Sequence, residues 1–237
     1  MKYAITDRVE VLGKVIIKGE KRFSFLSYLL HDKANVLIDT VPVRSGEELV
    51  EDIRTVLGEK RLDAIIMNHS EEDHSGALPA VLAAYPDTPV YCTAACRNRL
   101  LKVLPQAEFH IVRTGEILQI DDFKFVFQET PGLHWDDNMV TFLSKEKILF
   151  SNDLFGQMAA AEPILDREYT KEDLLAAADK YYTNVFEKAA PEEKQAIRSV
   201  AALPIRMIAP GHGVILQQYY IDILNLYLKK IENVVAG

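Results

Sequence analysis

Apolar and polar residues alternate along the first forty positions of the chain. The segments VEVLGKVIIKG, FSFLSYLL and NVLIDTV are rich in β-branched or aromatic residues. An alternation with period two is typical of strands that have one buried face. We therefore predict a run of antiparallel strands and hairpins at the start of the chain.

The pattern changes at Ser45, where helices and short strands begin to alternate. The segment SGEELVEDIRTVLG starts with a capping Ser45, continues with acidic residues and closes with Gly58, which predicts a helix. Short apolar segments then predict strands that alternate with helices, in the order of βαβ units. The strands are expected at 63–68, 89–93 and 110–114, and the helices at 76–86 and 96–105.

A second β-rich stretch covers about 117–152 and includes KFVFQET, MVTFLS and KILFSN. Helices follow at 170–189, with Thr170 as the cap, and at 191–203, with Pro191 at the helix start. The segment RMIAP predicts one last strand, and 217–236 predicts a long amphipathic helix.

This order of elements predicts an α/β (α+β) fold in which two sheets pack face to face and helices cover both outer faces. That architecture is a four-layered αββα sandwich. No repeat and no linker rich in Gly, Ser or Pro interrupts the chain, so we expect residues 1–237 to form a single domain.

Composition limits the partners and the location. The apolar fraction of 49% and the charged fraction of 26% are ordinary for a globular protein. A net charge of −8 without a cluster of Lys and Arg argues against a nucleic-acid partner or an anionic membrane surface. The start of the chain has no apolar signal core, and no stretch approaches the roughly 18 apolar residues of a spanning helix, so we expect a cytoplasmic protein.

Cys92 and Cys96 have a spacing that fits neither a disulfide framework nor a zinc ribbon, and we expect both to be buried.

The segment MNHSEEDHSG directly follows a predicted apolar strand and carries His69, Glu71, Asp73 and His74. In an extended loop, positions two apart project the same way, so His69, Glu71 and Asp73 are expected to converge while His74 turns to a neighbouring point. One loop can thus supply ligands to two metal ions. The alternative is an acidic surface loop, which usually carries Lys or Glu rather than two imidazoles.

Three further residues, His134, Asp153 and His212, each follow a predicted strand and lie among turn residues. A lone His in such a position is more often structural, as we expect for His31 and His110. Together with the loop, however, these three residues complete a set of imidazoles and carboxylates. A donor set of this kind without thiolate suits iron, manganese or zinc, and its share of oxygen favours iron or manganese. A metal-free scaffold is the remaining alternative.

The residues resemble a known pattern at this point. The metallo-β-lactamase fold is built around H-x-H-x-D-H, and this chain has H-x-E-x-D-H with Glu71 in place of the second His. This variant, followed by a His, an Asp and a last His, resembles the flavodiiron proteins, which reduce oxygen and nitric oxide. The segments FSFLSYLLHDKANVLIDTV, DHSGALP, GLHWDDNM, LFSNDLFGQ and KYYTNV also resemble family segments.

The resemblance implies a centre of two iron ions. One ion would be bound by His69, Glu71 and His134 and the other by Asp73, His74 and His212, with Asp153 and an oxo, hydroxo or water ligand as bridges. Flavodiiron proteins continue into a flavodoxin-like domain that binds FMN, whereas this chain stops at Gly237, so we expect no FMN in this chain. The family often has an additional histidine in its N-terminal hairpin, where this sequence has VIIKGEKRFSF.

The resemblance also implies the function and the partners. The chain is similar to stand-alone oxygen-binding diiron proteins, so we expect it to bind dioxygen or nitric oxide as an oxygen sensor or carrier that acts on a signalling protein. A reductase that receives electrons from a separate rubredoxin or flavodoxin is the first alternative. A zinc-dependent hydrolase of the same fold is the second, and Glu71 speaks against it.

Two aromatic residues and the assembly state complete the predictions. Trp135 adjoins His134 in the sequence and is expected to pack against the metal site. Tyr91 ends a predicted strand and is a weaker candidate for the same pocket. The long C-terminal helix could pair two subunits in a homodimer.

Overall fold

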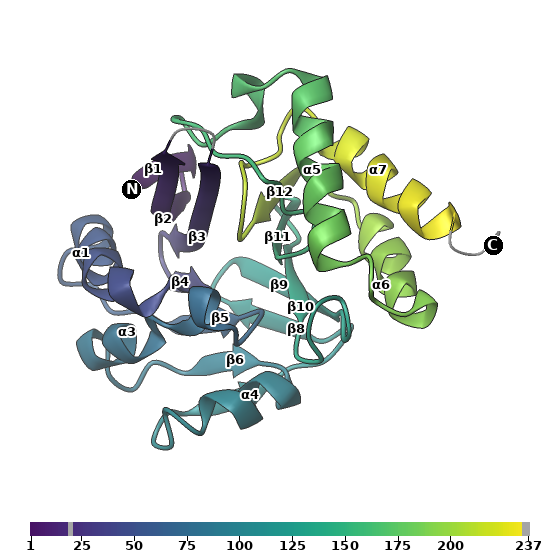
Figure 1. Cartoon of the computed structure of the whole chain (residues 1–237). Coiled ribbons are helices and arrows are strands. Elements are labelled where there is room, and N and C mark those ends of the chain that lie inside the picture. The colour runs from purple at the N-terminus through teal and green to yellow at the C-terminus, as the bar shows by residue number, and fades with distance from the viewer. Residues whose placement is uncertain (19–20, 234–237) are drawn as a thin grey trace.

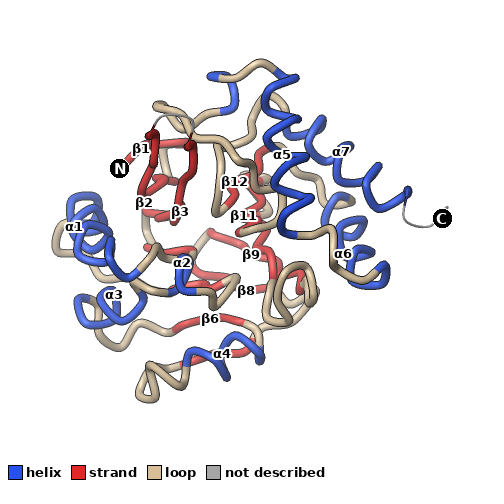
Figure 2. Tube along the Cα trace, in the orientation of Figure 1, coloured by secondary structure: helices blue, strands red, loops and turns tan. Residues whose placement is uncertain are grey.

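The strands of the chain form two sheets, as seen in a computed structural model that describes residues 1–18 and 21–233 (Figures 1 and 2). The first sheet has seven strands in sequence order. Its strands are β1 (Lys2–Thr6), β2 (Val9–Lys18), β3 (Lys21–His31), β4 (Asn35–Ile38), β5 (Ala64–Met67), β6 (Val90–Cys92) and β7 (Phe109–Ile111). The first four strands pair antiparallel and β4 to β7 pair parallel. The change occurs where helices begin to connect the strands, because a parallel pair needs a crossover connection.

The second sheet has five strands in the order β12-β11-β10-β9-β8. Its strands are β8 (Ile117–Ile120), β9 (Phe123–Glu129), β10 (Met139–Leu143), β11 (Ile148–Asn152) and β12 (Met207–Pro210). All neighbours are antiparallel except β11 and β12, which are parallel. The connection between these two strands contains the helices α5 (Lys171–Val185) and α6 (Pro191–Ala201), as a parallel crossover requires.

Helices cover both outer faces of the pair of sheets. In Figure 1, α1, α3 and α4 lie on one side of the strands and α5, α6 and α7 lie on the other. The helices are α1 (Gly46–Leu57), α2 (Glu72–Ser75), α3 (Leu78–Ala84), α4 (Ala94–Leu100), α5 (Lys171–Val185), α6 (Pro191–Ala201) and α7 (Tyr220–Asn233), with 3-10 turns η1 (Val43–Ser45) and η2 (Asp166–Glu168). This arrangement confirms the predicted αββα fold.

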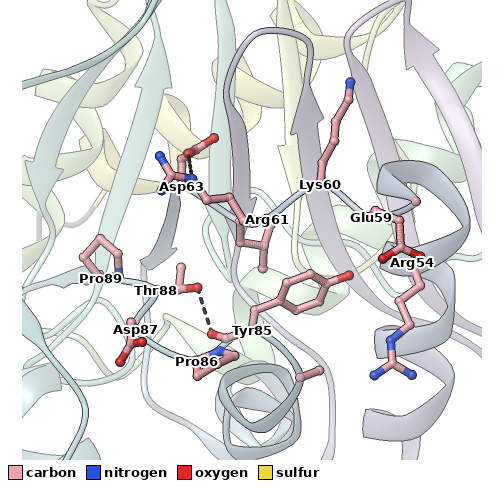
Figure 3. A pocket seen from close by; sticks show the side chains of 13 residues that line it. Arg54, Glu59, Lys60, Arg61, Asp63, Tyr85, Pro86, Asp87, Thr88 and Pro89 are labelled. Atoms are coloured by element: carbon pink, nitrogen blue, oxygen red, sulfur yellow. Dashed lines mark hydrogen bonds and ion pairs between the residues drawn. The ribbon is translucent and has the colours of Figure 1, made fainter.

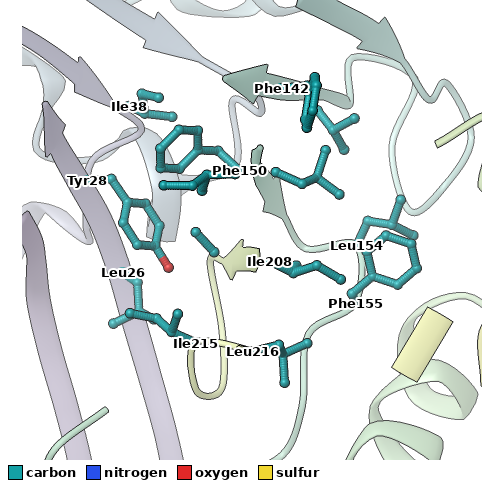
Figure 4. Close-up of a cluster of buried hydrophobic side chains, with 14 of the residues drawn as sticks. Leu26, Tyr28, Ile38, Phe142, Phe150, Leu154, Phe155, Ile208, Ile215 and Leu216 are labelled. Atoms are coloured by element: carbon teal, nitrogen blue, oxygen red, sulfur yellow. The ribbon is translucent and has the colours of Figure 1, made fainter. Parts of the chain in front are cut away.

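The main hydrophobic core lies between the two sheets and extends to the helices α5, α6 and α7. Figure 4 shows Tyr28 and Ile38 of the first sheet facing Phe150 and Ile208 of the second. Full burial of each such side chain contributes about 1.5–3 kcal/mol. The facing sheets are therefore held together by apolar contacts along most of their length.

A second core lies between the first sheet and the helices α1, α3 and α4. It contains Cys92 and Cys96, both buried and both free thiols, as predicted. Among the residues that the structure describes, no helix is long and apolar enough to cross a membrane.

Two details of the predicted elements were wrong. Ser45 precedes α1 as predicted, but its side chain makes no capping hydrogen bond, because it ends the 3-10 turn η1. The segment after Glu71 is not extended, since residues 72–75 form the single turn α2. The expected convergence of alternate positions in this segment therefore does not apply to Asp73. The predicted C-terminal helix begins at Tyr220, and its last residues, 234–236, lie outside the described residues.

The loops that carry the candidate ligands leave the carboxyl ends of β5, β9, β11 and β12. The two sheets meet at this edge, where the backbone N–H of Met139 donates to the carbonyl of Asn68 at 2.9 Å. A surface cleft of about 860 Å³ lies at the other end of β5 and β6, lined by the residues that precede these strands (Figure 3). The cationic side chains that Figure 3 labels in this cleft do not converge: Arg61 pairs with Asp63, and Arg54 and Lys60 point in different directions.

Candidate metal centre

The structure brings all of the predicted ligand residues together, and we refer to them as the seven candidate ligands. Within each of two groups, one donor atom from every residue lies within 4.8 Å of the others. The first group is His69, Glu71, His134 and Asp153, and the second is Asp73, His74 and His212. His31 and His110 belong to neither group.

The first group surrounds the Glu71 carboxylate. Glu71 Oε2 lies 2.9 Å from His134 Nε2 and 3.3 Å from His69 Nε2. Asp153 Oδ2 lies 3.7 Å from His69 Nε2 on the buried side. Imidazoles from two distant loops thus face the same carboxylate oxygen.

The second group surrounds the Asp73 carboxylate. His74 Nε2 lies 3.6 Å from Asp73 Oδ1, and His212 Nε2 lies 3.3 Å from Asp73 Oδ2. Asp153 joins this group through its other oxygen, because Oδ1 lies 3.1 Å from His74 Nε2 and 3.3 Å from His212 Nε2. Asp153 therefore faces both groups, one with each oxygen.

The donor atoms fit a pair of divalent cations. Asp73 Oδ1 and Asp153 Oδ2 are buried and have no hydrogen-bond partner among the described residues. Buried carboxylate oxygens without a partner are costly unless a cation or donor compensates them. Imidazole nitrogen and carboxylate oxygen without thiolate form a donor set that suits iron, manganese and zinc.

The electrostatics of the site favour positive charge. Burial disfavours the charged form of His69, but its hydrogen bonds to Asp137 and Glu71 outweigh burial and raise its pKa to about 10. The same balance between burial and the Asp153 and Asp73 carboxylates raises the pKa of His212 to about 10. The hydrogen bonds of His134 and His69 lower the pKa of Glu71 to about 2. Protons thus compensate the carboxylates here, and metal ions would displace them.

Neighbouring acceptors fix the tautomers of two imidazoles. His69 Nδ1–H donates to Asp137 Oδ1 at 2.9 Å, and His212 Nδ1–H donates to the Ser24 carbonyl at 2.7 Å. Once Nε2 of each ring gives up its proton, its lone pair faces the site, as ligation requires. Asp137 also accepts from the backbone N–H of Ser70 at 2.9 Å. The sequence analysis missed Asp137, although it lies three residues after His134.

Asp39 is a second residue that the sequence analysis missed. Its buried carboxylate accepts from the backbone N–H of Asn68 at 2.7 Å, from Asn68 Nδ2 at 2.9 Å and from Asn152 Nδ2 at 3.1 Å. Asn68 precedes His69 and Asn152 precedes Asp153. The next residue, Thr40, donates from its backbone N–H and its hydroxyl to the His74 carbonyl, both at 2.7 Å. The end of β4 therefore holds the loops of both groups, and a lone Asp after the apolar segment NVLI was the available signal.

Tyr181 is the third residue that was missed. Its buried hydroxyl, on α5, donates to Asp153 Oδ1 at 3.0 Å. The ring lies against the backbone of Gly156, where an added Cβ would be 2.6 Å from the ring. The loop after β11 is thus held against the helix layer.

The two aromatic predictions had different outcomes. The Trp135 ring lies edge-on to His69 at a centroid distance of 5.1 Å, and its centroid is 6.1 Å from that of His134. Tyr91 instead stacks on His110 at 5.0 Å, on the neighbouring strands β6 and β7. The expectation that Tyr91 faces the metal pocket therefore has no support in its contacts.

Comparison with known proteins identifies the family. Residues 23–213, which include all seven candidate ligands, match the family described as "ODP family beta lactamase". The chain belongs to this family. The ODP-family chain is 39% identical over 211 residues to the anaerobic nitric oxide reductase flavorubredoxin of Salmonella typhi. It is 38% identical over the same length to a flavorubredoxin homolog of Escherichia coli O157:H7.

These matches cover 87% of the ODP-family chain but only 44% and 51% of the two relatives. The chain thus spans about half the length of the curated relatives it matches. We therefore treat their activity, substrates and partners as a basis for proposals about this chain.

Solved structures of flavodiiron proteins share the fold. Rubredoxin oxygen:oxidoreductase from Desulfovibrio gigas superposes with a TM-score of 0.89 at 27% identity, over 98% of the ODP-family chain and 62% of that protein. A point mutant of the flavo di-iron protein from Thermotoga maritima gives a TM-score of 0.86 at 29% identity, over 96% and 60% of the two chains. The resemblance to flavodiiron proteins is confirmed.

Proposed function

We propose that this ODP-family chain binds two iron ions and that the centre reduces dioxygen or nitric oxide with electrons from an external donor. The observation that carries the proposal is the convergence of the seven candidate ligands into two adjoining groups that share Asp153. The flavorubredoxin and flavodiiron relatives support the choice of iron and of these gases.

In this proposal the two groups of side chains bind one ion each. His69, Glu71 and His134 would hold the first ion, Asp73, His74 and His212 would hold the second, and Asp153 would contribute one oxygen to each. A carboxylate can bridge because its two oxygens point apart, and Asp153 Oδ2 and Oδ1 face different groups. Tyr181 and Asp137 hold the bridging carboxylate and the His69 ring in place.

Aromatic side chains line part of the site. The centroids of the Phe23 and Phe25 rings lie 4.5 Å and 5.5 Å from the centroid of the His212 ring. Both phenylalanines belong to β3. The Trp135 ring contacts the His69 ring edge-on. An apolar surrounding of this kind favours small uncharged ligands such as dioxygen and nitric oxide over hydrated anions.

Electron supply decides between turnover and simple binding. Two ferrous ions provide two electrons, whereas reduction of dioxygen to water consumes four. We therefore propose a donor of the rubredoxin or flavodoxin type. A protein that binds dioxygen without such a donor would act as the predicted oxygen sensor or carrier.

The experiment is anaerobic reconstitution with Fe(II), followed by Mössbauer spectroscopy and by mixing with dioxygen or nitric oxide. We expect two irons per chain, a coupled diferric spectrum after oxidation, and sustained gas consumption only when a reduced rubredoxin or flavodoxin is present. A single uptake of dioxygen that reverses on removal of the gas, with no turnover from any donor, would favour the carrier. Stoichiometric zinc in purified protein together with hydrolysis of an ester or lactam would overturn the proposal.

We also propose that residues 1–237 act as one domain, because the first sheet contributes to both hydrophobic cores. A homodimer and a cytoplasmic location stay predictions.

A further inference from the structure

His134 is more exposed than the other imidazoles of the site. Its side chain is 30% exposed, whereas those of His69, His74 and His212 are 0%, 1% and 5% exposed. The Glu71 carboxylate beside it is 35% exposed. The first group of candidate ligands is therefore exposed to solvent at His134 and Glu71. In the second group the imidazoles of His74 and His212 are buried.

The backbone of His134 is also unusual. Its φ is +83°, which makes it the one member of the seven candidate ligands in the left-handed region. Gly132, two positions earlier, has a φ of +80°, and His134 N–H donates to the Gly132 carbonyl at 2.9 Å, which closes a tight turn. Non-glycine residues are rare in this conformation, and the strain persists only where the surroundings enforce it.

The surroundings hold the His134 ring less firmly than the other rings. Among the described residues, the hydrogen bond of its Nε2 with Glu71 Oε2 at 2.9 Å is its only one. By contrast, Nδ1 of His69 and of His212 donates to Asp137 and to Ser24, respectively. His74 lacks such a partner but is enclosed, since a Cβ on Gly211 would lie 2.7 Å from its ring.

From these three differences we infer that the coordination position of His134 is exchangeable. A small uncharged monodentate donor from solvent, such as imidazole or a diatomic gas, takes this position when the His134 ring swings outward. The other six candidate ligands keep both metal ions in place. The inference rests on the proposed function, because it assumes that the first group binds a metal ion.

The exchange has a physical basis in the contacts of the ring. The ring swings outward about its own side-chain bonds, without a change in the backbone of the turn, and exchanges its contact with Glu71 for contact with water. No hydrogen bond on Nδ1 has to break. External ligands would therefore enter the centre at its exposed edge, next to Glu71.

Two matched variants, His134→Gly and His69→Gly, test the inference, with Co(II) as the metal and free imidazole as the ligand. Glycine suits position 134 because it adopts a φ of +83° without strain. We expect His134→Gly to retain two Co(II) per chain after gel filtration and to show a saturable change in its visible spectrum with imidazole. We expect His69→Gly to lose at least half of its Co(II) and to show no such change, because position 69 is fully buried.

Equal loss of Co(II) in the two variants, or retention of both ions in His134→Gly without any response to imidazole, would overturn the inference. If the wild-type chain itself binds fewer than two ions, the proposed function fails instead. Thermal unfolding of the metal-free variants checks the fold, and His134→Asn replaces His134→Gly if the glycine variant unfolds, since Asn also tolerates this backbone region.

Discussion

At the residue scale, the candidate ligands depend on side chains that are not themselves candidate ligands. Asp39 accepts hydrogen bonds from Asn68 and Asn152, the residues that precede His69 and Asp153. Thr40 donates to the carbonyl of His74. These contacts join the first sheet to the second at the edge where the site lies. Removing one of them should therefore move ligands of both groups.

Replacement of Asp39 by Asn tests this dependence. Asp39 accepts three hydrogen bonds, and an amide in its place leaves at least one buried donor unpaired whichever way it is turned. We expect a loss of about 2 kcal/mol in the free energy of unfolding and a loss of about tenfold or more in metal affinity. Chemical denaturation and competition with a chelator measure the two effects. Asp63→Asn is the control, because Asp63 accepts from Asn35 and Arg61 and lies before β5, at the opposite end of that strand from the site. Equal effects in the two variants would contradict the role of Asp39.

Tyr181 and Tyr182 offer a matched pair on α5. Tyr181 donates to Asp153, whereas the buried hydroxyl of Tyr182 has no partner among the described residues. Tyr181→Phe should cost about 1 kcal/mol of stability and should shift the Mössbauer parameters of the loaded protein, because the Asp153 carboxylate, which we propose as the bridge, loses a donor. Tyr182→Phe should leave the spectrum unchanged. An unchanged spectrum in Tyr181→Phe would show that this hydrogen bond does not act on the centre.

At the element scale, the ends of helices and strands decide where the loops go. The buried carboxylate Asp166 Oδ2 accepts from the backbone N–H groups of Gln217, Gln218 and Tyr219, at 2.9, 2.8 and 2.8 Å. These groups lead into α7, so Asp166 joins η2 to the start of the last helix. The helix layer on this side packs against the loop that carries Asp153.

Asp166→Ala should destabilise the protein by about 2 kcal/mol, because three backbone N–H groups at the start of α7 lose their acceptor. Metal stoichiometry should stay at the wild-type value, since Asp166 contacts none of the candidate ligands. Thermal unfolding and metal analysis of purified protein measure these two outcomes. Glu168→Ala is the control, because Glu168 is exposed in the same 3-10 turn. Loss of metal in Asp166→Ala at a temperature where the variant stays folded would contradict this separation.

At the scale of the whole molecule, metal binding and folding are linked through pH. The folded, metal-free state raises the pKa of His69 and of His212 from 6.5 to about 10. Because folding raises the pKa values of the two imidazoles, their stabilisation of the folded state is complete below pH 6.5 and is lost as the pH rises through 10. The pKa of Glu71 is lowered from 4.5 to about 2, so its stabilisation is present above pH 4.5 and is lost as the pH falls toward 2.

We therefore expect the metal-free protein to become less stable between pH 6.5 and 10, while the metal-loaded protein changes less over this range. Metal binding should release protons and should strengthen as the pH rises, because the ion replaces protons on the imidazoles. Differential scanning calorimetry with and without metal, together with isothermal titration in buffers of different ionisation enthalpy, measures both effects. A binding enthalpy that is independent of the buffer would show that no proton is displaced. Excess metal at 100 times its dissociation constant should add about 2.7 kcal/mol of stability.

The sequence by itself determined the order of strands and helices, because apolar periodicity is a local property that survives in the fold. It also determined which residues could bind a metal ion. His69, Glu71, Asp73 and His74 lie in one short segment, and an ordinary acidic surface loop seldom carries two imidazoles. The pattern could not reveal that residues 72–75 form a helical turn, because tertiary contacts such as the hydrogen bond from Val43 N–H to Glu72 hold this turn.

Only the tertiary structure decided which ligand faces which neighbour. His134 and Asp153 reach the first group because β9 and β11 end at the same edge as β5, a fact that depends on the packing of two sheets. The supporting residues Asp39, Asp137 and Tyr181 were hidden for the same reason. A single Asp or Tyr has no local pattern, and its role arises from hydrogen bonds to residues 28 to 113 positions away in the chain.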